Sequence, residues 1–185
     1  MVLPRSCRTT DRTSGADRDC QPRSAKRSNQ PGAGPANGWG IGSRRIDVSF
    51  DGEQPEITER WTSRNIKPDH NDFVAHNGHL YGFDRKIFTS IDLETGERNW
   101  KKGRYGHGQV LLLPNQDQLL ILSETGDLVL LRATPERHEE LASIQAIGGK
   151  TWTHPVLVND RLYVRNDEEA ACFQMPLKPQ DSPQL

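Results

Sequence analysis

Apolar and polar residues alternate in short runs along the second half of the chain, and these runs come in similar groups. The groups begin at Val74, Val110 and Val156, which are 36 and 46 positions apart. Each group has an apolar run, a tight turn and a second apolar run, which predicts a β-hairpin. Repetition at roughly 40 residues, with one small antiparallel sheet in each unit, is typical of a β-propeller. The pattern therefore predicts an all-β fold.

The unit that begins at Val74 predicts four strands. Asn77 and Gly78 separate the first two strands, and this pair is a strong hairpin signal because both residues tolerate positive φ. Residues 87–93 alternate as a third strand, and a fourth strand starts at Arg98 after a turn. Four strands joined by short turns make one propeller blade.

The other units repeat this pattern less completely. In the second unit, residues 140–147 are predicted as the fourth strand. Leu141, Ile144 and Ile147 are spaced by three, which also suits a helix over 136–146, but the register of the repeat favours a strand. The last unit, 153–175, has three predicted strands, and the leading residues 46–61 have two. The expected fold is a partial β-propeller of four-stranded antiparallel blades.

Composition divides the chain into three parts. Residues 1–45 are basic and rich in Arg, Ser, Gly and Pro, with too few apolar side chains to offset chain entropy, so we expect disorder. Residues 46–175 hold the blades, and residues 176–185 form a C-terminal tail. One alternative for the first segment is a basic arm for nucleic acid, but interspersed Asp and the lack of aromatic interleaving argue against it. Another is upstream sequence read from a mis-called start codon.

Charge and hydropathy exclude some classes of function. The net charge is −1 at pH 7 and the mean hydropathy is −0.78, so we expect no nucleic-acid partner. No run is long and apolar enough to predict a transmembrane segment, and no signal peptide follows Met1. The cysteines form no C-x-x-C pair, so no zinc site is expected. Cys172 lies in an apolar run and is expected to be buried.

Residues 92–100 resemble the D-x-x-T-G-x-x-x-W signature of PQQ-like (quinoprotein alcohol dehydrogenase-like) propeller repeats. Residues 80–83 and 126–131 are similar to two strands of the same repeat. Residues 148–166 resemble the last blade of secreted bacterial propellers, some of them named after the outer-membrane assembly propeller lipoprotein. The resemblance covers residues 56–175 and implies the C-terminal blades of a larger propeller.

The resemblance implies structural roles for three residues, Trp61, Gly96 and Trp100. In the family, the tryptophan docks one blade against the next, and the two tryptophans here are 39 positions apart. An indole suits such a joint because it offers a large apolar area and a hydrogen-bond donor.

The resemblance implies a non-catalytic binding or scaffold module, as a fragment of a periplasmic or secreted propeller. The alternative is the C-terminal part of a quinoprotein-type dehydrogenase, an oxidoreductase. Quinoprotein dehydrogenases carry adjacent cysteines over the cofactor, whereas Cys172 stands alone, so neither PQQ nor another cofactor, and no catalytic residue, is predicted. Unpaired blade edges predict self-association or a protein partner.

Two histidines occupy matching positions, His107 and His154, each just before the first strand of a unit. First strands start near the central channel of a propeller, so the loops that precede them are candidates to line it. The candidate channel-lining residues are Arg104, Tyr105, His107, Lys150, Trp152 and His154. Basic and aromatic groups there suit an anionic or carbohydrate-like ligand. The alternative is that each histidine caps its loop. The channel hypothesis predicts that His107→Ala and His154→Ala weaken ligand binding without lowering the melting temperature.

Overall fold

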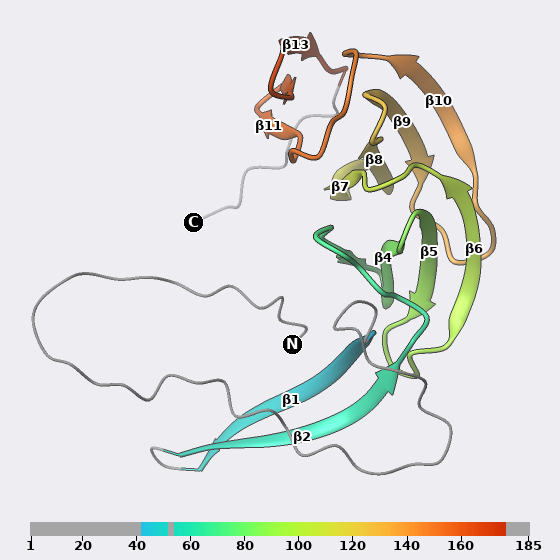
Figure 1. Ribbon diagram of the computed structural model, residues 1–185. Helices are drawn as coiled ribbons and strands as arrows, with labels where there is room; N and C mark the ends of the chain where they lie inside the picture. Colours follow the sequence, from blue (N-terminus) through green and yellow to red (C-terminus); the bar gives the residue numbers. More distant parts are fainter. Residues whose placement is uncertain (1–41, 52–53, 177–185) are drawn as a thin grey trace, which may run out of the picture.

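The computed structural model describes residues 42–51 and 54–176, and this part of the chain is all-β. Its thirteen strands form four antiparallel sheets that follow one another along the chain. In Figure 1 the sheets are arranged along an open arc, with β4 (His79–Asp84) and β7 (Gln109–Leu113) on the concave side and β6 (Arg98–Arg104) and β10 (Glu140–Gln145) on the convex side. The predicted all-β fold is confirmed, and the arrangement is compatible with propeller blades. Residues 1–41, where disorder is expected, and residues 177–185 of the predicted tail lie outside the described residues.

The first sheet is a hairpin of β1 (Ser43–Asp51) and β2 (Gln54–Ser63). Both predicted leading strands are present and longer than expected. The composition places residues 43–45 in the basic segment, but here they pair with β2. Arg45 is held there because its guanidinium donates to the Leu93 carbonyl at 3.1 Å and lies 2.6 Å from the Glu94 carboxylate.

The second sheet has the strand order β3-β4-β5-β6. Its strands are β3 (Val74–His76), β4 (His79–Asp84), β5 (Ile87–Asp92) and β6 (Arg98–Arg104). Asn77 and Gly78 have φ values of 48° and 79°, so both adopt the left-handed conformation that a tight hairpin turn requires. The predicted four-strand unit is confirmed.

The third sheet repeats this meander in the order β7-β8-β9-β10. Its strands are β7 (Gln109–Leu113), β8 (Gln118–Leu122), β9 (Asp127–Arg132) and β10 (Glu140–Gln145). The strand prediction for residues 140–147 is confirmed over the helical alternative. A three-residue 3₁₀ turn, Pro114–Gln116, connects β7 to β8. Within the described ranges, no helix could cross a bilayer.

The fourth sheet has three strands, β11 (Val156–Val158), β12 (Arg161–Arg165) and β13 (Ala170–Gln174). Leu162 and Val164 are buried against the third sheet, whereas the opposite face is exposed. Cys172 lies on this exposed face, so the prediction that it is buried is wrong. The apolar run around it is real, but no further described sheet covers that face.

The core lies between consecutive sheets rather than inside any one of them. Between the second and third sheets, Phe83 and Phe88 pack with Ile121. Between the third and fourth, Leu122 packs with Leu162. Strand β8 therefore buries side chains on both faces, which explains why its sequence is a continuous apolar run rather than an alternation.

Candidate binding site

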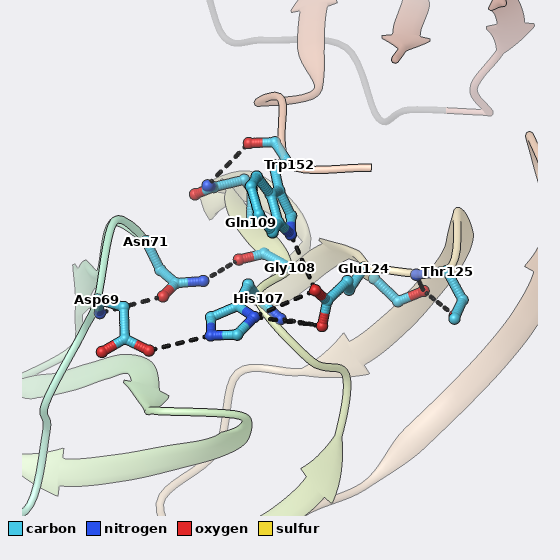
Figure 2. Close-up of polar contacts among 9 residues, drawn as sticks. Asp69, Asn71, His107, Gly108, Gln109, Glu124, Thr125 and Trp152 are labelled. Atoms are coloured by element: carbon cyan, nitrogen blue, oxygen red, sulfur yellow. Dashed lines mark hydrogen bonds and ion pairs between the residues drawn. The ribbon is translucent and has the colours of Figure 1, made fainter. Parts of the chain in front are cut away.

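Loops from three sheets meet at one place on the structure (Figure 2). Asp69 comes from the segment between β2 and β3, His107 from the β6–β7 loop, Glu124 from the β8–β9 loop and Trp152 from the β10–β11 loop. In an antiparallel meander, the loop before the first strand and the turn between the second and third strands lie at the same end of the sheet. The topology therefore brings together residues that are far apart in the sequence.

His107 bridges two carboxylates. Its Nε2 lies 3.1 Å from Asp69 Oδ2, and its Nδ1 lies 3.2 Å from Glu124 Oε1 and 3.3 Å from Oε2. The His107 backbone N–H also donates to Glu124 Oε2 at 3.1 Å. Both ring nitrogens are thus engaged by protein oxygens.

Glu124 is held as a carboxylate. Trp152 Nε1 donates to Glu124 Oε1 at 3.0 Å, in addition to the contacts from His107. Burial alone would raise the pKa of Glu124, but the hydrogen bonds from Trp152 and His107 outweigh burial and lower the pKa to about 2. Glu124 is therefore ionised at neutral pH and links two loops.

Trp152 is partly accessible, with 44% of the residue exposed. Lys150 Nζ lies 3.6 Å from the centroid of its ring, which is a cation–π contact. The His70 ring lies 5.1 Å from Trp152 at a tilt of 57°, and it stacks on His107 at 5.4 Å. Rings and a cation thus surround the indole.

Buried amides fix these loops. Gln109 Nε2 donates to the Trp152 carbonyl at 3.2 Å, and Gln109 Oε1 accepts from the Asp72 N–H at 3.4 Å. Asn71 Nδ2 donates to the Gly108 carbonyl (Figure 2). Because the amides of Asn71 and Gln109 are buried, these bonds position the loops with little competition from water.

The structure brings together only some of the six predicted residues. His107, Lys150 and Trp152 lie together. His154 is connected to them through Asp72, whose Oδ2 lies 2.8 Å from His154 Nε2.

Arg104 and Tyr105 make none of these contacts. Arg104 is the last residue of β6 and pairs with Ile87. The Tyr105 hydroxyl lies 2.8 Å from His138 Nε2 and donates to Glu140 at 3.2 Å, at the joint between the second and third sheets. Burial and the Glu140 charge raise the pKa of Tyr105.

The tryptophans at the joints make the same contact twice. Trp61 Nε1 on β2 donates to the Leu93 carbonyl just after β5 at 3.0 Å. Trp100 Nε1 on β6 donates to the Thr134 carbonyl just after β9 at 2.9 Å. Each bond runs from the last strand of one sheet to the turn after the third strand of the next.

Gly96 allows the first of these joints to close. It has a φ of 72°, and a Cβ built there would lie 2.8 Å from Trp61 Cδ2. The Gly96 carbonyl also accepts hydrogen bonds from Ser63 Oγ at 2.7 Å and Asn65 Nδ2 at 2.9 Å. A larger residue at position 96 would push the indole away from the turn.

Sequence reasoning did not identify Asp69, His70 or Glu124 as site residues. Glu124 lies in a β-turn, where polar residues are expected, so a glutamate at this position does not indicate a functional site. Within the parts of the chain that the structure describes, no group of three or more His, Cys, Asp or Glu side chains is arranged to hold a metal ion.

Comparisons with known proteins leave the family open. No family model matches the chain, and no curated protein matches it. A solved structure of S. cerevisiae Dbp5 bound to Nup159, Gle1, IP6 and ADP contains a chain that is 16% identical, with a TM-score of 0.33. The match covers 57% of this chain and 30% of that chain, and it supports no argument about fold or function.

Proposed function

We propose that the chain is a PQQ-like β-propeller repeat protein and acts as a non-catalytic binding or scaffold module within a larger, exported propeller. The observation that carries this proposal is the repeated joint. Trp61 and Trp100 donate to equivalent carbonyls of consecutive sheets, Leu93 and Thr134. A repeated sheet-to-sheet contact of this kind supports blades stacked in series.

The chemistry at the loops favours binding over catalysis. A general base needs a free nitrogen or oxygen within reach of a substrate proton. Both nitrogens of His107 face Asp69 and Glu124, and Glu124 also accepts from Trp152. These groups stabilise the loops and leave Trp152 as the accessible surface.

The charge balance selects among ligands. Three carboxylates, on Asp69, Asp72 and Glu124, accompany the cation and imidazoles around Trp152. They oppose an anionic ligand, so the carbohydrate-like alternative is favoured. A neutral sugar can pack an apolar face against the part of Trp152 that Lys150 and the imidazoles leave exposed, and it can exchange hydrogen bonds with surrounding polar groups.

Calorimetry on the full chain tests this function, with maltohexaose, cellohexaose and PQQ plus Ca²⁺ as probes. We expect saturable binding of an oligosaccharide that Trp152→Ala weakens at least about tenfold, which corresponds to about 1.4 kcal/mol. Tyr163→Ala, which removes another exposed aromatic ring, is the matched control and should bind as the unmodified chain does. Binding of PQQ together with dye-linked alcohol oxidation would instead support the dehydrogenase alternative. Binding of none of the probes would contradict the carbohydrate assignment.

Exposed apolar faces on the first and last described sheets support the proposed role as a scaffold. Phe50 and Ile57 on the first sheet are 72% and 62% exposed, and Val156, Val158 and Tyr163 on the fourth sheet are about half exposed. Apolar faces of this kind are typical of interaction surfaces. Further blades or another copy of the chain would cover them.

A further inference from the structure

Cationic side chains gather around the turn between β4 and β5. Lys67 forms a parallel bridge with Asp84, and the Arg85 N–H donates to the Lys67 carbonyl at 3.0 Å. On the other side of the turn, Ile87 pairs with Arg104 and Thr89 pairs with Lys101. The backbone register therefore places five cations at one end of the second sheet, namely Lys67, Arg85, Lys86, Lys101 and Arg104.

One carboxylate lies among them, and it is already engaged. The Asp84 side chain is 2% exposed, with Lys67 Nζ at 2.9 Å and Lys101 Nζ in contact with its Oδ2. Arg98 Nη2 approaches the same oxygen at 3.5 Å. Burial raises the pKa of Asp84, but the two lysines lower it below its ordinary value, so Asp84 is ionised.

The remaining cations have no such partner. Arg85, Lys86 and Arg104 are exposed, and none of them forms an ion pair with another described residue. Against the single charge of Asp84, the five cations leave a formal excess of four positive charges, and Arg98 beside the same carboxylate adds a fifth. The excess is not needed to compensate the buried carboxylate, which Lys67 and Lys101 already neutralise.

We propose that this end of the second sheet, named here the β4–β5 basic cluster and made of the five cations above, binds a ligand that carries several phosphate groups. The cations come from three separate segments, so a single monoanion would reach only one or two of them. A chain of phosphates spans several, and guanidinium groups bind phosphate oxygens in pairs. The five cations are not among the residues of the Trp152 site, so this inference does not depend on the proposed function.

Isothermal titration of the full chain with sodium tripolyphosphate, and separately with orthophosphate, tests the proposal. We expect saturable tripolyphosphate binding that is much tighter than orthophosphate binding and weakens as salt rises. The double variant Lys86→Gln/Arg104→Gln should bind tripolyphosphate at least about tenfold more weakly, since each charge-assisted hydrogen bond contributes about that factor. The matched control is Arg132→Gln/Arg137→Gln, which removes two cations already paired with Glu139. It should bind as the unmodified chain does.

A second variant, Arg85→Gly, guards against misfolding. Arg85 has a φ of 60°, which glycine adopts without strain, so this variant should keep the melting temperature and still lose affinity. Vesicles of phosphatidylcholine with added phosphatidylinositol bisphosphate identify the source of the phosphates. Vesicle binding displaced by tripolyphosphate assigns them to a lipid headgroup, whereas tripolyphosphate binding alone assigns them to a free ligand. No saturable tripolyphosphate binding, or an equal loss in the control variant, would overturn the proposal.

Discussion

Trp100 has two functions at its joint. Its Nε1 donates to Thr134 on the next sheet, and its ring lies 6.2 Å from Tyr81 and 6.0 Å from Phe88 in the core between the second and third sheets. Trp100→Ala removes both the bond and the packing. We expect it to lower the free energy of unfolding by about 3–5 kcal/mol, measured by urea denaturation.

The control for this prediction is Tyr163→Ala. Tyr163 is an aromatic residue of the fourth sheet that is 47% exposed, so truncating its side chain should cost less than about 1 kcal/mol. Equal losses of unfolding free energy in the two variants would mean that Trp100 does not stabilise the contact between the two sheets.

The two candidate histidines should differ in their effect on stability. His107→Ala removes the imidazole that lies between the carboxylates of Asp69 and Glu124, so we expect a loss of about 1–3 kcal/mol in a thermal melt. His154 and its partner Asp72 are about half exposed, so His154→Ala should change stability by less than about 1 kcal/mol. The channel hypothesis predicts instead that both variants keep the melting temperature, so the melt distinguishes the two accounts. An unchanged melting temperature for His107→Ala would contradict the bridging role.

Glu124 should make stability depend on pH in the acid range. Its pKa in the folded chain is about 2, below the ordinary value of about 4.3. A lowered carboxyl pKa means that the unfolded chain binds the proton more tightly, so the contribution of Glu124 is complete above about pH 4.3 and is lost as pH falls through about 2. Urea unfolding across this range should show a shallower acid-side slope for Glu124→Gln than for the unmodified chain. Parallel slopes would count against an ionised, hydrogen-bonded Glu124.

At the scale of elements, local pattern was enough to predict most strands. The turn at Asn77-Gly78 and the alternation over 87–93 are local properties, and both elements are present. The site was less predictable because its contacts are long-range. Asp69 and Glu124 lie 38 and 17 positions from His107, and they meet it only because of how the sheets stack. Cys172 shows the same limit, since an apolar run does not reveal whether a neighbouring sheet covers it.

Two glycines in hairpin turns provide a matched test of the element geometry. Gly78 and Gly126 have similar φ values, 79° and 86°, so alanine strains the backbone about equally, by about 1–2 kcal/mol. A Cβ at Gly78 meets nothing within 4 Å, whereas a Cβ at Gly126 would lie 2.1 Å from the Ile147 carbonyl oxygen. We therefore expect Gly126→Ala to lower the melting temperature clearly more than Gly78→Ala. The same shift in both would show that the turn of residue 126 does not pack against Ile147.

At the scale of the whole molecule, the described residues form a series of sheets with cores between them. In such a series, each sheet is stabilised by its neighbours, so the first and last sheets have one uncovered face. Phe50 and Ile57 mark one uncovered face, and Val156, Val158 and Tyr163 mark the other. A head-to-tail contact between copies would bury one face against the other and would form a ring or a chain of molecules.

Sedimentation equilibrium of the full chain over a wide concentration range tests the central claim, that these sheets are serial blades whose end faces need a partner. We predict an average mass that rises with concentration. The double variant Val156→Glu/Val158→Glu, which places charge on the face of the fourth sheet, should shift the mass toward the monomer. A single monomeric species at every concentration, for both the unmodified chain and the variant, would contradict the account.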